Sequence, residues 1–145
     1  MRRTTAAALA LAATTALGLT LTGCDAAQEK AGDVFSSATA AVASAAEEKM
    51  NEVRDGVNAG GDVEAGPTST DGDRTVAEIT ATNPKDTAAD YTIMVNFRDA
   101  EGKFLDSVVL NIGGVEPGAS KSGTARSNRT LTGATTAEIS QALRH

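Results

Sequence analysis

The sequence has few of the residues that build catalytic and metal centres. Its 145 residues include one Cys, one His and no Trp, and aromatic residues make up 3% of the chain. One Cys and one His exclude an internal disulfide, the usual zinc sites and a Cys–His nucleophile pair. Basic residues are also few, because 13 Lys and Arg face 19 Asp and Glu. Nucleic-acid binding needs clustered positive charge, so we expect no nucleic-acid partner.

Residues 1–23 differ in composition from everything that follows them. Arg2 and Arg3 give a positive start, and residues 4–22 are rich in Ala, Leu and Thr and carry no charge. A positive region, an apolar region and small residues before a cleavage point describe a secretory signal peptide. The alternative is a transmembrane helix, which needs about 20 strongly apolar residues. Because Ala, Thr and Gly dominate here, we predict a signal peptide over 1–23.

This first segment ends in Leu21-Thr22-Gly23-Cys24. An aliphatic residue and two small residues before a cysteine resemble the lipobox of bacterial lipoproteins. The Ala-, Thr-, Gly- and Arg-rich composition with few Lys is typical of an actinobacterial lipoprotein. The resemblance implies that diacylglycerol, carrying palmitate-type chains, is attached to the Cys24 thiol and that cleavage falls between Gly23 and Cys24. Two acyl chains give stable membrane attachment, whereas one chain gives only marginal attachment. We expect the cell membrane as location, with the protein anchored through Cys24 and facing the extracytoplasmic side.

The next part, residues 24–59, has helical periodicity. Apolar residues recur in steps of three and four, which places them on one stripe of a helix. They are Phe35, Ala38, Val42, Ala45 or Ala46, Met50, Val53 and Val57. The stripe is narrow and mostly alanine, and acidic residues outnumber basic ones, which disfavours a helix lying on an anionic membrane. We predict a helical stalk over 24–59, with a self-associating or partner-binding helix as the alternative.

Residues 60–73 read GGDVEAGPTSTDGD and combine Gly, Pro, Ser, Thr and Asp without apolar periodicity. Such a composition is typical of a flexible linker. It predicts a domain boundary near Arg74, with the folded domain over 74–145.

From Arg74 onward the apolar period changes to two, which indicates β-strands half-buried against a core. Ala77, Ile79 and Ala81 alternate with polar residues, and so do the four apolar residues from Tyr91 to Phe97. Turn residues at Asn83-Pro84 and 99–102 separate the strands. Five strands are predicted, over 75–81, 91–98, 104–112, 120–127 and 135–143. We expect a mainly β protein, a small antiparallel immunoglobulin-like β-sandwich preceded by an α-helical stalk and a signal peptide.

Several residues of this region also carry a family resemblance. Asn83 ends a strand, Tyr91-x-Ile-x-Val95-x-Phe97-x-Asp99-x-x-Gly102 follows, and Pro117-Gly118 comes later. This arrangement resembles the FxLYD-type domain of bacterial secreted proteins over about half the chain. The resemblance implies an immunoglobulin-like sandwich and brings no catalytic residues.

The polar residues form no recognisable catalytic or metal motif. His145 is the last residue, and because chain termini are usually disordered we expect no catalytic role for it. The acids of 71–73 and 99–102 lack the spacing of a calcium loop, so we expect solvated surface and a hairpin tip. Asp86 and Asp90 are expected to be surface acids. Asn128-Arg129-Thr130 fits a glycosylation acceptor, to which a bacterial lipoprotein gives little weight.

Together these features predict a non-enzymatic, lipid-anchored surface module without cofactor, catalytic residue or metal. Its partners would be the membrane, through Cys24, and a protein or envelope polymer. The alternatives are a carrier of a small ligand or metal, and an envelope hydrolase. A carrier needs a roomy apolar pocket, which few aromatic residues make hard to line. A hydrolase needs titratable groups that converge in a cleft.

Overall fold

The computed structural model describes residues 38–145, and the signal peptide, Cys24 and the first part of the expected stalk lie outside them. A helix covers residues 38–51 of the described part. It is followed by β1 (Val57–Asn58), the short 3-10 helix η1 (Gly60–Asp62), β2 (Val63–Asp71), β3 (Arg74–Thr82), β4 (Ala89–Asp99), β5 (Phe104–Val115), β6 (Ser120–Arg126) and β7 (Ala134–Arg144).

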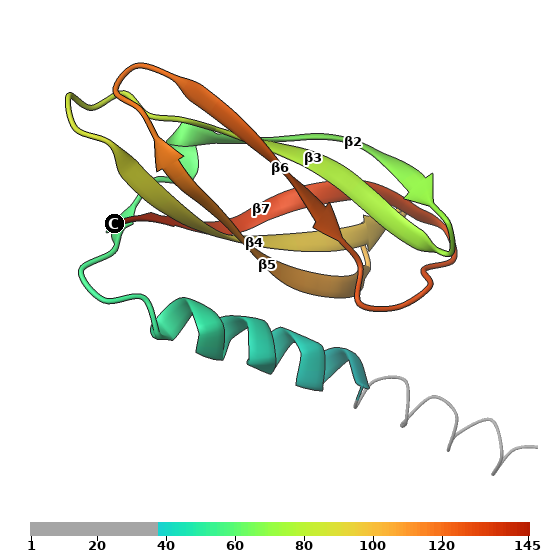
Figure 1. The fold of residues 1–145 in the computed structure, drawn as a ribbon. Coiled ribbons are helices and arrows are strands. Elements are labelled where there is room, and N and C mark those ends of the chain that lie inside the picture. The colour runs from blue at the N-terminus through green and yellow to red at the C-terminus, as the bar shows by residue number, and fades with distance from the viewer. Residues whose placement is uncertain (1–37) are drawn as a thin grey trace, which may run out of the picture.

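The strands form two antiparallel sheets that lie face to face (Figure 1). One sheet has the order β1-β7-β4-β5, and the other has the order β2-β3-β6. All of the pairings are antiparallel. The helix lies along the outer side of the sheet that contains β4 and β5 (Figure 1). The expectation of a mainly β, antiparallel sandwich is therefore confirmed, and all five predicted strands are present.

The core lies between the two sheets, where the period-two residues of β3 and β4 meet. Ala77, Ile79 and Ala81 of β3 are buried, as the alternation predicts. Tyr91, Ile93, Val95 and Phe97 of β4 are 0% exposed. Alternate residues of a strand point to opposite faces, so this pattern places one complete row of each strand in the core.

A buried amide organises the loops at one end of the sandwich. The Asn83 side chain is 0% exposed, and its Nδ2 donates to the carbonyl oxygens of Thr87 (2.7 Å) and Val115 (2.9 Å). Its Oδ1 accepts from the backbone N–H of Lys85 at 3.1 Å. Buried polar groups are stable only when they are hydrogen-bonded, and here the amide ties the loop after β3 to the end of β5.

The prediction of a flexible linker over residues 60–73 is wrong. Residues 63–71 form β2, which pairs with β3 at the edge of the smaller sheet. The register shifts between Ala65 and Thr68, so Gly66 and Pro67 sit at an irregularity of the ladder. Proline is tolerated in a sheet at such edge and bulge positions. The folded domain therefore begins well before Arg74.

The helix ends earlier than predicted, and its described part does not stand apart from the sandwich. It ends at residue 51, Asp55 has a positive φ of 58°, and residues 57–58 form β1 instead of a last helical turn. Ala46 and Met50 are buried against Met94 of β4, with Val109 and Leu143 packed around them. The described part of the predicted stalk is thus docked on the sheet, which corrects the expectation of a free-standing helix.

This docking also changes the environment of β4. The alternation predicts a half-buried strand, but Thr92 and Met94, on the face opposite the core, are 5% and 8% exposed. The helix covers that face, so β4 is buried on both sides.

Candidate functional site

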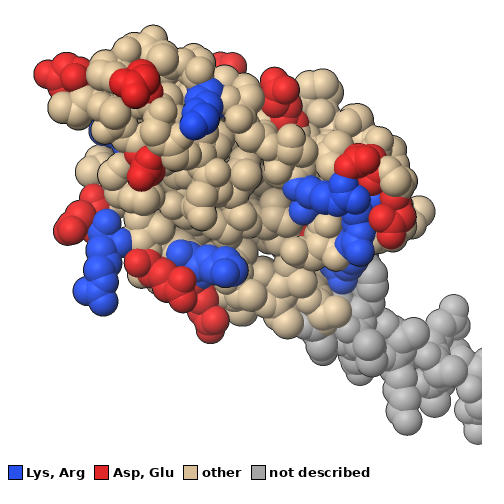
Figure 2. Space-filling model, viewed as in Figure 1, with Lys and Arg blue, Asp and Glu red and all other residues tan. Residues whose placement is uncertain are grey.

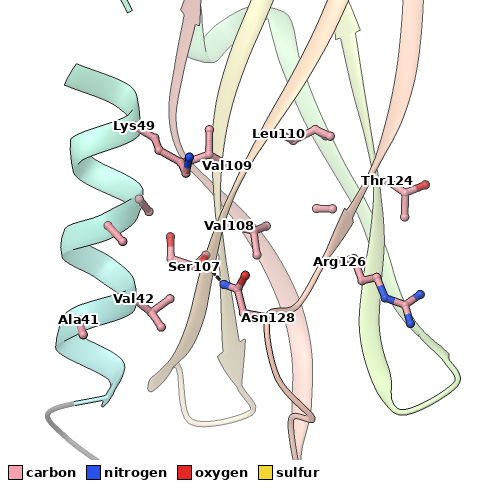
Figure 3. A pocket seen from close by; sticks show the side chains of 13 residues that line it. Ala41, Val42, Lys49, Ser107, Val108, Val109, Leu110, Thr124, Arg126 and Asn128 are labelled. Atoms are coloured by element: carbon pink, nitrogen blue, oxygen red, sulfur yellow. Dashed lines mark hydrogen bonds between the residues drawn. The ribbon is translucent and has the colours of Figure 1, made fainter. Parts of the chain in front are cut away.

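A groove of about 570 Å³ runs between the helix and one side of the sandwich (Figure 3). On that side β5 and β6 are the edge strands of the two sheets. Its walls are small and apolar, because the helix contributes alanines and a valine and the strands contribute aliphatic side chains. These apolar residues include Val42, Ala45, Val108, Val109, Leu110 and Ala125. A concave surface with apolar walls and a few polar groups is the usual form of a binding site.

A buried carboxylate fixes the segment after β6 against one end of this groove. Asp106 on β5 is 0% exposed, and its Oδ2 accepts from the backbone N–H of Asn128 at 2.7 Å. The Asn128 Nδ2 donates to the Ser107 carbonyl oxygen at 2.8 Å and lies 3.3 Å from Asp106 Oδ1. The Ser107 hydroxyl donates to Asn96 Oδ1 at 2.8 Å. These bonds satisfy the buried carboxylate and make this end of the groove rigid.

Two cations border the groove, and they differ in their surroundings. The Arg126 guanidinium pairs with the Asp71 carboxylate and points away from the helix (Figure 3). Lys49 projects from the helix towards Val109 and has no ion-pair partner among residues 38–145 (Figure 3). Figure 2 shows acidic and basic side chains gathered together at the β2–β3 hairpin end, whereas a wide area beside them carries neither. Lys49 is therefore the positive charge that the groove offers to an occupant.

A second hollow of about 480 Å³ continues beyond Lys49 and reaches the chain end. His145 lies in it and is ordered, contrary to the expectation, because its backbone N–H and carbonyl both bond to Asp90 at 3.0 Å. Its Nε2 lies 3.0 Å from the Thr92 hydroxyl. A catalytic imidazole needs a group that orients it and a nucleophile or substrate proton within reach. Here the group that orients the imidazole ring is the hydroxyl of Thr92, which is 5% exposed.

A cluster at the β1 end of the sheet has a structural role. Arg144 donates to Asp62 Oδ2 at 2.8 Å, and the Tyr91 hydroxyl donates to the Thr82 carbonyl oxygen at 3.2 Å. Burial raises the pKa of the Tyr91 hydroxyl above its ordinary value of 10.0. A phenol that resists ionisation in this way serves as a hydrogen-bond donor that ties β4 to the end of β3.

The acidic residues singled out in the sequence stabilise turns and ion pairs. Asp99 Oδ1 accepts from the backbone N–H groups of Glu101 (3.1 Å) and Lys103 (2.8 Å), which confirms a hairpin tip. Asp71 and Asp73 pair with nearby arginines. Asp86 and Asp90 are exposed, which confirms them as surface acids, and Asp90 Oδ1 accepts from the Gly114 N–H at 2.6 Å. Within residues 38–145, no three His, Cys, Asp or Glu side chains come together as a metal site.

The structure describes Asn128 of the glycosylation-like sequence, but not the predicted cleavage and lipidation residues. The Asn128 side-chain amide is committed to Asp106 and Ser107, so it is not presented as an acceptor. Gly23 and Cys24, the predicted cleavage and lipidation residues, lie outside the described residues. Among residues 38–145, no helix is both long and apolar enough to cross a bilayer.

Comparison with known proteins returned no family model, no curated protein and no solved structure that matches this chain. The likeness to bacterial lipoproteins and to the FxLYD-type domain therefore stays a prediction from the residues quoted above.

Proposed function

We propose that the protein is a bacterial lipoprotein, fastened to the outer side of the cell membrane through Cys24, whose immunoglobulin-like sandwich binds a protein or envelope polymer without catalysis. The observation that carries the proposal is Leu21-Thr22-Gly23-Cys24 at the end of an uncharged segment with two arginines before it. This combination supports export, acylation and cleavage together. The likeness to the FxLYD-type domain and an actinobacterial origin belong to the same proposal.

The groove supports a binding role for the folded part. Its walls are set by two sheets and a packed helix, its valines and Leu110 are partly exposed, and Lys49 lies at its border. Sites built on such rigid elements hold their geometry better than sites on loops. Carriage of a small ligand is the second candidate, because a volume of about 570 Å³ lies within the range of small-molecule pockets.

The anchor is tested by expressing the full chain in an actinobacterial host and replacing the proposed lipidation residue, Cys24→Ser. We expect the wild-type protein in the membrane fraction, with a diacylglycerol-modified cysteine as the first residue of the mature chain. The variant is expected to stay as a precursor or to leave the membrane fraction. Ala26→Ser introduces the same hydroxyl two residues away and serves as the control, which should be lipidated and retained normally.

The readouts are membrane fractionation and the mass of the N-terminal peptide. A mature chain that begins elsewhere, or a Cys24→Ser variant that is processed and retained like the wild type, would contradict the anchor. The carrier alternative is separated by native mass spectrometry of the protein purified from its host. A bound small molecule of constant mass favours the carrier.

A further inference from the structure

The hydrogen bonds of β5 show which of its backbone groups face the groove. In an antiparallel strand the N–H and C=O of one residue point to the same side, and successive residues alternate. The pairing of β5 with β4 is unbroken over residues 106–112. Within this stretch the Ser107 carbonyl accepts from Asn128, which is not part of β4. Ser107 therefore points away from β4, and by alternation so do Val109 and Asn111.

The two ends of this free edge are already occupied. Arg129 donates to the Leu105 carbonyl at one end, and Lys121 Nζ donates to the Gly113 carbonyl at 2.6 Å at the other. Between them, the backbone groups of Val109 and Asn111 that point away from β4 bond to no group within residues 38–145. Open backbone edges of this kind readily pair with another strand, and proteins normally cover or charge them. The opening lies where the groove, lined by Val109, meets the second hollow, lined by Val109 and Asn111.

We propose that the groove takes an extended peptide segment of a partner protein, which pairs with the β5 edge at Val109 and Asn111 and so adds a strand to the sheet. The proposal rests on the proposed role as an interaction module and names the class of partner. Main-chain hydrogen bonds would supply affinity, and the two walls would receive alternate side chains. The helix forms one wall, through residues such as Val42 and Ala45, and β6 borders the other side at Thr124 and the nearly buried Ala125.

The open backbone distinguishes a peptide from the other apolar occupants. An acyl chain would bury the Val109 N–H and C=O without a partner, and burying an unsatisfied polar group is destabilising. A peptide strand satisfies them. A second sandwich is disfavoured because the helix and β6 rise on both sides of the edge (Figure 3). The walls favour small aliphatic side chains, and Lys49 favours a carboxylate on the partner.

The free protein gives the first test, through amide hydrogen exchange of the full chain in mild detergent. The amides of Val109 and Asn111 should exchange at least about tenfold faster than those of Val108 and Leu110, which point to β4. Equal protection of all four amides at every protein concentration would overturn the assignment of the open edge. Protection of Val109 and Asn111 that rises with protein concentration would identify a second copy as the occupant and overturn the peptide proposal.

The second test uses a displayed library of random short peptides selected on the full chain. Selected peptides should carry alternating aliphatic residues, and adding one should slow exchange at Val109 and Asn111 about tenfold. Asn111→Pro removes the outward N–H and spares the ladder with β4, so affinity should fall about tenfold or more. Asn111→Ala keeps the N–H and should bind like the wild type. Ala45→Trp fills the groove and should abolish binding, whereas Ala40→Trp, on the same helix outside the groove, should not.

The remaining outcomes count against the proposal. Peptides that bind equally to Asn111→Pro and Ala45→Trp, or a library that yields no groove-dependent binder, would overturn it. So would protection of the same amides by phosphatidylglycerol vesicles that compete with the selected peptides, because that result identifies an acyl chain. The anchor test at Cys24 is independent of every variant used here. A failed groove and a failed lipid anchor can therefore be told apart.

Discussion

Shortening one methionine should release the helix from the sandwich without unfolding the sheets. Met50 is 2% exposed and is the largest helix side chain in the contact with Met94. Truncating a buried methionine to alanine costs about 2–5 kcal/mol, depending on how far the site can collapse. The helix lies at the surface and can settle inward, so the lower end, about 2 kcal/mol, applies to Met50→Ala.

Such a loss corresponds to a roughly 25-fold increase in the undocked population, since 1.4 kcal/mol changes an equilibrium constant tenfold. Amide exchange in residues 42–51 should therefore accelerate by about that factor. The core amides of β3 and β4 should keep their wild-type rates. Glu47→Ala, an exposed change on the same helix, is the control and should alter neither set.

Two results would refute the reasoning. If helix amides exchange at the wild-type rate in Met50→Ala, the methionine does not hold the helix. If core amides of the sandwich accelerate as much as helix amides, the helix and sheets unfold as one unit, and the helix is not a separately docked element.

Three further predictions concern the sandwich itself. Val95→Asp and Phe97→Asp should each abolish cooperative thermal unfolding, because both side chains are 0% exposed and an unpaired carboxylate would enter the core. A wild-type melting temperature in either variant would contradict the strand assignment. Asn83→Ala should lower the free energy of unfolding in urea by about 2–4 kcal/mol, because the carbonyls of Thr87 and Val115 both lose their donor. A loss below about 0.5 kcal/mol would show that water replaces the amide. Because the pKa of Tyr91 is raised, the folded state keeps the phenol proton at a pH where the unfolded state has lost it. The free energy of unfolding should therefore fall as pH rises above about 10, and it should fall less steeply in Tyr91→Phe. Tyr91 is the only tyrosine, so its phenolate absorbance reports the ionisation directly.

The strands that face the core were predictable because each carries a complete alternating row. From Ala77 to Ala81 in β3 and from Tyr91 to Phe97 in β4, every second residue is apolar and buried. This period of two is visible without any knowledge of the partner strands. β2 was not predictable in this way, because its sequence lacks such an alternating row. An edge strand has one neighbour, and only Val63 of β2 is fully buried, so its sequence needs little alternation and accommodates Gly66 and Pro67.

The docked helix and the groove could not be derived in the same way, because they depend on which surfaces meet. The stripe of the helix is weak, and of its described residues 38–51 only Ala46 and Met50 are buried. One signal was present in the strands. Met94 and Val109 are apolar residues on faces that the alternation assigns to solvent, and both pack against the helix. An apolar residue on each of two paired strands, directly opposite on the outer face, indicates a covering element.

The contact between Met50 and Met94 joins two thioethers at the junction of helix and sheet. Oxidants convert such sulfur atoms into polar sulfoxides, and reductases reverse the change. A sulfoxide at this contact would weaken the apolar packing that holds the helix down. Chemical damage there would therefore open one wall of the groove while the disulfide-free sandwich kept its shape, and repair would close it again.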